Sequence, residues 1–275
     1  MNTNNYAELA EKARRIRINA LKAIHAAKSG HPGGSLSSAD ILATLYFGEL
    51  NIDPKNPKMA DRDKFVLSKG HAVPALYAAL GERGFYEVNE MMTLRQVGSK
   101  FQGHPNMSKV PGIEMSTGSL GQGFSAAVGM AAAGKIDKNP VRVYVLTGDG
   151  ELQEGIVWEA AMQAAHRKLD NLVAIVDLNG LQIDGKVSDV KCVCPVDEKF
   201  RSFGWNVINV DGHNFEELTT AFKEAKSSEG VPTAIIAHTH KGNGVSFMED
   251  NAGWHGKAPS DEELAAAIKE LGGDN

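Results

Sequence analysis

The sequence is poor in several features that mark specialised classes of protein. Only two of its 275 residues are cysteines, which excludes a scaffold built on many disulfides. No apolar run approaches the roughly 20 residues that span a bilayer, so no membrane-spanning helix is predicted. A net charge of −5 argues against general binding to nucleic acid or to anionic membranes. The amino-terminal residues lack the apolar core of a secretory signal, and we therefore expect a cytoplasmic protein.

The two cysteines are Cys192 and Cys194, separated by one residue. Such a pair rarely forms a strain-free disulfide, and no further cysteine could complete a zinc site, so we expect reduced thiols. Hydrophobic residues make up 42% of the chain and charged residues 23%, as in an ordinary soluble protein. The length allows one large core, and we expect residues 1–275 to form a single domain.

Short apolar runs alternate with amphipathic stretches along the chain. Strands are expected at 65–68, 141–146, 172–176, 205–210 and 232–237. Helices are expected at 6–28, 38–50, 72–83, 122–136, 215–226 and 260–271, with a Gly- and Pro-rich loop at 29–34. This alternation predicts an α/β fold with a doubly wound, mainly parallel sheet and helices on both faces. Two long irregular stretches, 98–121 and 238–256, are candidates for functional loops.

Polar residues follow two consecutive predicted strands. Gly148-Asp149-Gly150 follows the apolar run 141–146, and Asn179 follows the run 172–176. A right-handed crossover places Asp149 and Asn179 at the same carboxyl edge of the sheet. Carboxylate and amide oxygens there could share Mg²⁺, whose shell phosphate oxygens and water usually complete. The flanking glycines would let such a ligand approach closely. The alternative is an ordinary βαβ unit with a solvated acidic turn.

Four of the nine histidines lie in glycine-flanked loops: His31, His71, His104 and His255. Each alone is typical of a surface or capping position. Together, in the loops of one α/β domain, they indicate a site rimmed by imidazoles, which exchange protons near neutral pH and hydrogen-bond to hydroxyls. A zinc site is a weaker interpretation, because no pair has the short spacing of zinc-binding histidines.

The segment Gly121–Ala126 fits the G-x-G-x-x-A pattern of dinucleotide-binding proteins. A nicotinamide-dependent Rossmann dehydrogenase is therefore a rival hypothesis. However, the preceding residues make a poor strand, and no acidic residue ends a second strand about 20 residues later.

The motif GDG, followed about 30 residues later by Asn179, resembles the thiamine-diphosphate motif, and GDGELQEGIVWEA resembles transketolase in particular. The resemblance implies the diphosphate-binding version of the thiamine-diphosphate fold. It also implies that Mg²⁺ or Ca²⁺ is bound by the Asp149 carboxylate, the Asn179 side-chain oxygen and the Leu181 main-chain carbonyl. The family motif often ends in two asparagines, whereas this chain has Leu178 before Asn179.

The histidine loops SGHPGG, SKGHA, GHP and GWHGKAP also resemble transketolase loops, in the same order. By that resemblance, the catalytic residues are His31, His71, His104, His255 and Glu154. His31 and His255 are the favoured pair for the donor C3 hydroxyl and the acceptor aldehyde, and Lys241 reaches the diphosphate. Glu154 and Glu159 resemble carboxylates at a subunit interface, although two solvated helix acids are an alternative for Glu159. The implied cofactor-binding set is His71, Gly118, Ser119, Leu120, Asp149, Gly150, Asn179, Ile183, Lys241 and His255.

The function implied by the resemblance is transfer of a two-carbon ketol unit from a ketose to an aldose. The resemblance covers only the first part of a full-length transketolase. We therefore expect a partner, the carboxy-terminal subunit with the pyrimidine-binding domain, in a heterotetramer of two copies each. Ordinary pentose and heptulose phosphates of the pentose phosphate pathway are the default substrates, and sulfonated or branched ketoses are the alternative. A thiamine-diphosphate synthase of the deoxyxylulose-phosphate type and a non-catalytic paralogue are the alternatives.

Overall fold

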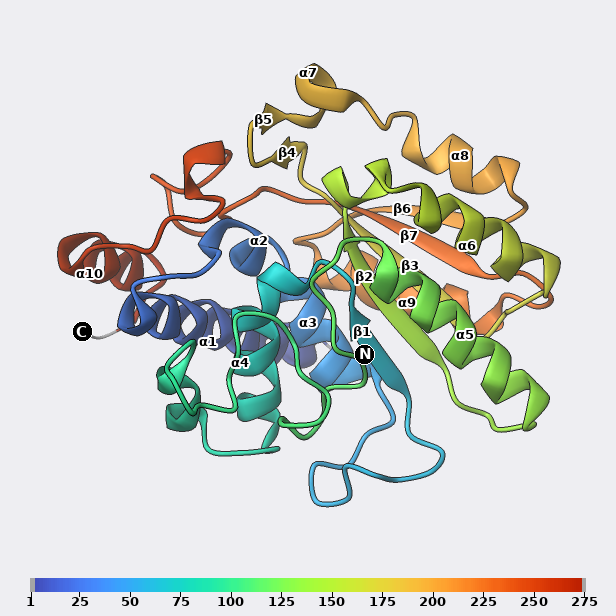
Figure 1. The fold of residues 1–275 in the computed structure, drawn as a ribbon, viewed down its shortest axis with the longest axis horizontal. Coiled ribbons are helices and arrows are strands. Elements are labelled where there is room, and N and C mark those ends of the chain that lie inside the picture. Colours follow the sequence, from blue (N-terminus) through green and yellow to red (C-terminus); the bar gives the residue numbers. More distant parts are fainter. Residues whose placement is uncertain (1–2, 274–275) are drawn as a thin grey trace.

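A computed structural model describes residues 3–273 of the chain. Its centre is a five-stranded sheet in the order β1-β2-β3-β7-β6, in which every neighbouring pair is parallel (Figure 1). The strands are β1 (Lys64–Leu67), β2 (Val143–Gly148), β3 (Leu172–Leu178), β6 (Asn206–Asp211) and β7 (Thr233–His238). All carboxyl ends therefore lie at one edge, where the predicted site residues were expected to meet.

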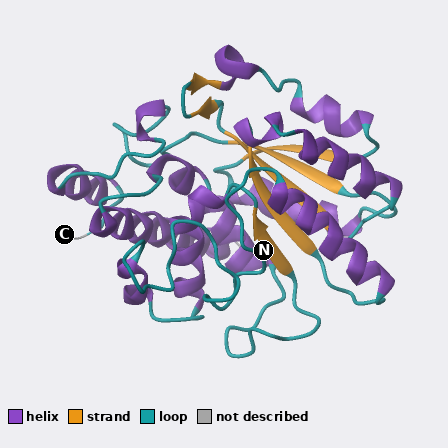
Figure 2. Ribbon diagram, in the orientation of Figure 1, coloured by secondary structure: helices purple, strands orange, loops and turns teal. Residues whose placement is uncertain are grey.

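Helices cover both faces of the sheet, which confirms the predicted fold class (Figure 2). One face packs against α1 (Thr3–Ala27), α3 (Ala39–Thr44), α4 (Val73–Arg83) and α9 (Phe215–Ser227). The other face packs against α5 (Gln122–Ile136), α6 (Gly155–His166) and α8 (Val196–Ser202). Consecutive residues of β2 and β3 enter opposite cores, because side chains alternate along a strand. This two-sided burial is the reason the strands read as continuous apolar runs.

The remaining elements surround the carboxyl edge of the sheet or extend the helical layer. A hairpin of β4 (Leu181–Gln182) and β5 (Gly185–Lys186) leads into α7 (Val187–Lys191), at the top of the view in Figure 1. Helix α10 (Asp261–Glu270) packs against α1, and its capping box of Ser260 and Glu263 is present as predicted. Short helical turns occupy Leu45–Glu49, Gly70–Ala72, Val88–Thr93, Gly150–Gln153 and Ala252–Trp254.

The prediction for residues 29–50 was wrong in two places. Helix α2 (Pro32–Ser37) begins inside the stretch expected to be a loop. Proline fits the first turn of a helix, where its missing N–H is not needed. Gly33 serves close packing there, since a Cβ at that position would lie 3.0 Å from the side chain of Lys241. The expected helix over 38–50 is divided into α3 and the turn Leu45–Glu49, and α7, α8 and the hairpin were not predicted.

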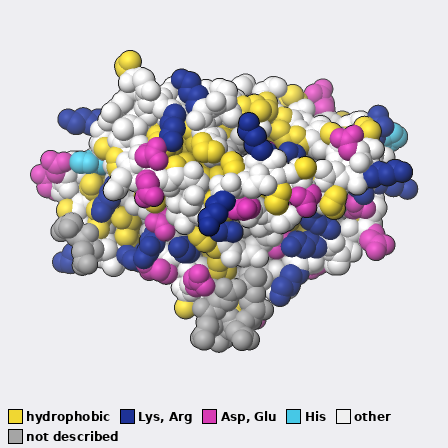
Figure 3. Space-filling view, turned by 90° about the horizontal axis from the view of Figure 1, so that it is seen from below, with side chains coloured by type: hydrophobic (Ala, Val, Ile, Leu, Met, Phe, Trp, Pro, Cys, Tyr) yellow, Lys and Arg dark blue, Asp and Glu magenta, His cyan; other side chains and the backbone are white. Residues whose placement is uncertain are grey.

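Basic and acidic side chains are intermingled on the face of the molecule seen from below in Figure 3. Within residues 3–273, every helix is too short or too polar to cross a membrane.

Candidate active site

The predicted metal-binding turns meet at the carboxyl ends of β2 and β3. Asp149 follows β2, and its main-chain N–H donates to the carbonyl of Asp177 at 3.2 Å. The Asp149 carboxylate accepts hydrogen bonds from the N–H groups of Gly180 (2.5 Å) and Gly150 (2.8 Å). The turn that contains Asn179 is therefore held directly against Asp149, as the crossover argument predicted.

The other two predicted ligands belong to the same turn. The Asn179 Oδ1 accepts from the N–H of Leu181 at 3.1 Å, and the Leu181 carbonyl accepts from Lys241 Nζ at 3.0 Å. A carboxylate, an amide oxygen and a carbonyl oxygen form the hard donor set that Mg²⁺ and Ca²⁺ prefer. The chemistry of these residues thus fits a divalent ion.

Burial is the main influence on the charged groups of this turn. Asp149 is 1% exposed. Burial, together with the nearby negative charge of Asp177, raises the pKa of Asp149 to about 6, against two stabilising backbone N–H groups. Burial lowers the pKa of Lys241 to about 8, with Lys69 adding to the effect. A bound cation would favour the ionised Asp149, and a bound diphosphate would favour the charged Lys241.

A buried ion pair that the sequence did not predict joins Lys69 and Asp177 beside the metal-binding turn. Asp177 accepts hydrogen bonds from Lys69 Nζ, Ser37 Oγ, Thr239 Oγ1 and Asn179 Nδ2. Burial opposes ionisation of Asp177, but Lys69 and these hydrogen bonds hold its pKa below the usual value. Lys69 belongs to the SKGHA segment, and Asp177 lies near the end of β3. Their positions in the sequence do not indicate that the two side chains would pair.

Glu151 is the second residue that the sequence analysis missed. Its side chain is 2% exposed and accepts from Ser68 Oγ and from the N–H groups of Gly121 (2.8 Å) and Gly148 (3.1 Å). Burial raises the pKa of Glu151, although these three donors oppose the rise. The residue therefore joins the ends of β1 and β2 to the loop before α5.

Three of the four loop histidines form a cluster. The ring centroids of His31, His71 and His255 lie 5.0–5.3 Å apart. Burial lowers the pKa of His31 to about 4 and that of His255 to about 3, and it also lowers the pKa of His71 well below the usual value. All three rings are therefore neutral at pH 7. The Nδ1 atoms of His31 and His255 are buried without a hydrogen-bond partner, which is rare for buried polar atoms.

A cavity of about 310 Å³ separates the metal-binding turn from the histidine cluster. All of the residues that were predicted for the site line this cavity except His104 and Ser119. His104 stands behind Gly118, where a Cβ would lie 3.2 Å from its ring, and Ser119 lies between Gly118 and Leu120. Glu154 lines the cavity, whereas Glu159 lies in a separate surface groove between α5 and α6.

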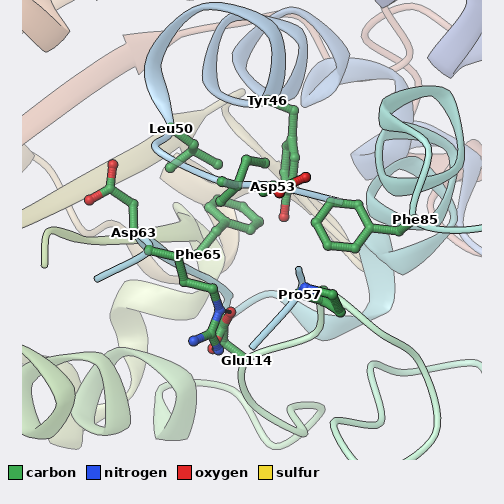
Figure 4. A pocket seen from close by; sticks show the side chains of 11 residues that line it. Tyr46, Leu50, Asp53, Pro57, Asp63, Phe65, Phe85 and Glu114 are labelled. Atoms are coloured by element: carbon green, nitrogen blue, oxygen red, sulfur yellow. Dashed lines mark hydrogen bonds and ion pairs between the residues drawn. The ribbon is translucent and has the colours of Figure 1, made fainter. Parts of the chain in front are cut away.

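A second cavity lies at the opposite end of the sheet. It is lined by residues around the amino end of β1, among them Tyr46, Asp63, Phe65 and Phe85 (Figure 4). Its volume of about 10 Å³ is room for about one water molecule. Parallel α/β sheets bind ligands at the carboxyl ends of their strands, so the larger cavity is the functional candidate.

The segment Gly121–Ala126 opens α5, but no strand precedes it in the described residues 94–121. Gly123 packs instead against β1, since a Cβ there would lie 2.7 Å from the Cα of Ser68. The pattern that suggested a dinucleotide site thus serves helix-to-strand packing.

Comparison with known proteins identifies the family. The sequence model described as "Transketolase, thiamine diphosphate binding domain" matches residues 9–275. The chain belongs to the transketolase family. It is 46% identical over 264 residues to a 6-deoxy-6-sulfo-D-fructose transketolase subunit of Clostridium sp. (strain MSTE9), covering 96% of each chain. It is 43% identical to one of the apulose-4-phosphate transketolase subunits of Phocaeicola vulgatus, covering 96% of this chain and 93% of that one.

Single-chain transketolases match over only part of their length. Human transketolase is 46% identical over 261 residues, which cover 94% of this chain and 41% of the human protein. The crystal structure of the Campylobacter jejuni transketolase superposes with a TM-score of 0.92 at 37% identity, covering 100% of this chain and 44% of that one. The Leishmania mexicana transketolase gives 0.91 at 34% identity, covering 97% and 41%. The chain thus corresponds to the thiamine-diphosphate-binding domain of transketolase, with the predicted thiamine-diphosphate fold.

Proposed function

We propose that this chain is the diphosphate-binding subunit of a two-chain transketolase, which transfers a two-carbon ketol unit from a ketose to an aldose in the cytoplasm. The observation that supports the proposal is the cavity itself. The predicted oxygen ligands, a lysine and three neutral imidazoles all line it. Such a site suits a ligand with an anionic, metal-bound end and a reactive end where protons are exchanged.

The metal-binding turn and the residues around it would hold thiamine diphosphate and Mg²⁺ or Ca²⁺. Asp149, Asn179 and Leu181 would bind the metal, and Lys241 would bind the diphosphate. Gly118, Leu120, Gly150 and Ile183 would surround the cofactor, together with Ser119. When bound, thiamine diphosphate supplies a thiazolium ring that can accept the electrons of a broken carbon–carbon bond.

The histidine cluster would move protons. A neutral imidazole can accept a proton, and His31 and His255, which line the cavity, would do so at the donor C3 hydroxyl. His71 and His104 would hydrogen-bond to oxygens of the two-carbon unit. Glu154, at the rim of the cavity, would be shared with the neighbouring subunit.

The partner subunit would supply the pyrimidine-binding domain. Helix α5, with the sequence QGFSAAVGMAAAGKI, is apolar around most of its circumference, which is unusual for a helix at the surface. An apolar groove lined by Val128, Gly129, Ala132 and Ile156 runs between α5 and α6, and Met162 on α6 is 49% exposed. We propose that subunits of a heterotetramer, with two copies of each chain, cover this face. Light scattering after size-exclusion chromatography of the co-expressed pair tests the assembly.

The substrates would be anionic sugars, with phosphates of the pentose phosphate pathway as the default. Arg95 supports this. Its Nη1 donates to Ser29 Oγ at 3.1 Å, and its guanidinium packs against Gly103, between the loops of His31 and His104. Within residues 3–273, no acidic side chain forms an ion pair with Arg95. An anionic end group could therefore pair with it. The two subunit relatives named above are named for a sulfonated and a phosphorylated sugar.

The test is a titration of the co-expressed pair with thiamine diphosphate and Mg²⁺, followed by a ketol-transfer assay. We expect binding that is lost with a metal chelator and restored by Mg²⁺. His255→Ala should lower turnover by roughly 100-fold or more, as expected for a proton-transferring group, with the cofactor still bound. Unchanged turnover would remove that role from His255. Formation of deoxyxylulose phosphate instead of ketol transfer would favour the related synthase, and binding without turnover would favour a non-catalytic paralogue.

A further inference from the structure

Lys241 stands on a loop that has no helix or strand between 239 and 251. Three hydrogen bonds made by main-chain groups hold the backbone around Lys241 in place. The N–H of Gly242 donates to the carbonyl of Gly33 at 3.0 Å, and the N–H of Asp250 donates to the carbonyl of Lys241 at 2.8 Å. The third is different, because the N–H of His240 donates at 2.9 Å to a side chain, the Nε2 of His213. The position of Lys241 thus depends on a histidine from another part of the chain.

His213 is held in one tautomer by its two partners. It lies in the turn between β6 and α9, and its Nδ1 is 2.7 Å from Oδ2 of Asp40. Because Nε2 accepts an N–H group, this nitrogen carries no proton. The proton is therefore on Nδ1, which donates it to Asp40. The Nδ2 of Asn243 lies 3.1 Å from this Nδ1, but both groups are donors in this tautomer, so Asp40 alone accepts the Nδ1 proton.

Asp40 connects this histidine to the helical core. It belongs to α3, is 4% exposed, and accepts two hydrogen bonds from Arg17 of α1, at 2.9 Å and 2.5 Å. A two-point contact between guanidinium and carboxylate fixes the direction of both groups. The orientation of the Asp40 carboxylate, and with it that of the His213 ring, is therefore set by two packed helices.

The side chain of His240 also contacts His213 and Asp250. Its ring stacks on that of His213, with centroids 5.9 Å apart and planes 15° apart. Its Nδ1 lies 2.9 Å from Oδ2 of Asp250, the residue whose N–H holds the Lys241 carbonyl. His240 and Asp250, which take part in two of the three hydrogen bonds around Lys241, are thus joined to His213, although His213 does not line the cofactor cavity.

We propose that His213 is a positioning residue for the diphosphate, which acts by holding the main chain at His240 so that Lys241 Nζ stays at the edge of the cavity. This inference rests on the proposed function, since it assumes that the diphosphate binds at Lys241. It assigns a role in cofactor affinity to a residue outside the cavity. When His213 is replaced, the hydrogen bonds from Gly242 to Gly33 and from Asp250 to Lys241 remain. We therefore expect the loop to become more mobile without unfolding.

The test compares His213→Phe with His238→Phe. Phenylalanine at 213 keeps a ring that can stack on His240 but removes both nitrogens. His238, two residues before His240, is the matched control. The Nε2 of His238 lies 3.2 Å from Oδ1 of Asn209, and His238 does not line the cofactor cavity. Amide hydrogen exchange on the full chain reports the loop directly, without cofactor. The Kd for thiamine diphosphate with Mg²⁺, and kcat at saturating cofactor, are then measured on the complex with the partner subunit.

In His213→Phe we expect faster exchange at residues 240–242 and a rise of about five- to tenfold in the Kd for thiamine diphosphate, as for the loss of one hydrogen bond. The value of kcat at saturating cofactor should change less than twofold, and His238→Phe should resemble the wild type. Unchanged exchange and Kd in His213→Phe would overturn the proposal, as would an equal effect of His238→Phe.

His213→Gln keeps an oxygen that can accept the N–H of His240 and should give a Kd between those of the wild type and His213→Phe. If His213→Phe does not fold, His213→Asn, with its shorter side chain, provides the decisive comparison, and a wild-type Kd and exchange rate in it would refute the role. A wild-type complex that binds no thiamine diphosphate would instead refute the proposed function, while the exchange experiment would still report whether His213 holds the loop.

Discussion

Replacing Glu151 by glutamine should destabilise the chain, although Glu151 is a carboxylate in an unfavourable, buried position. Its two oxygens accept from three donors: Ser68 Oγ, the N–H of Gly121 and the N–H of Gly148. Glutamine keeps one oxygen, which can serve the two donors that share Oε1. Its NH₂ group then faces the N–H of Gly148, so two donors oppose each other at a site that is 2% exposed.

The magnitude follows from these contacts. Loss of one hydrogen bond to a charged acceptor costs about 1.5–3 kcal/mol, and an unsatisfied buried donor costs about 1–3 kcal/mol. Removal of a buried charge offsets part of this, because burial already raises the pKa of Glu151. We expect a net loss of about 2–4 kcal/mol in the free energy of unfolding, measured by urea denaturation of the full chain at pH 7. Glu224→Gln, at an exposed position on α9, is the control. A loss below about 1 kcal/mol, within the range of an ordinary surface substitution, would refute the reasoning.

Three further predictions concern stability. Lys69→Met leaves Asp177 buried without its cation and should cost about 3–5 kcal/mol in urea denaturation; an effect under about 1 kcal/mol would mean that the three other donors suffice. The unfolded His255 ring takes up a proton near pH 6.5, whereas the folded ring does so only near pH 3, so stability should fall as pH drops below 6.5. His255→Gln should therefore lose about 1 kcal/mol less than wild type between pH 6.5 and pH 5, allowing for the partial exposure of the ring, and parallel pH profiles would contradict this. Ser260→Ala removes the cap on the N–H of Glu263 and should cost about 1 kcal/mol by thermal denaturation; a change in cofactor affinity would show that α10 influences the site.

The sequence predicted the sheet and the meeting of Asp149 with Asn179 because both depend on local rules. Apolar runs identified the strands, and the handedness of the crossover determined that their carboxyl ends share an edge. The capping box at Ser260 was found for the same reason, since its two residues are three apart. Helix α2 was missed because glycine and proline were read as breakers, whereas Pro32 starts the helix and the glycines pack closely within it.

The missed parts of the site depend on contacts between distant segments. Lys69 and Asp177 are 108 residues apart, and the Glu151 side chain binds the N–H of Gly121 from 30 residues away. Charged residues in such positions look like surface residues until the fold buries them. The same holds for the pKa shifts of the histidines, which result from burial that no spacing could indicate.

The walls of the cavity come from segments spread between His31 and His255, almost the full length of the chain. A fragment that lacks either end cannot build the pocket, so recognition of the cofactor requires the complete native topology. Any molecule that binds there will stabilise only the finished structure, by mass action. A titration with such a ligand would therefore measure the fraction of correctly folded molecules in a preparation.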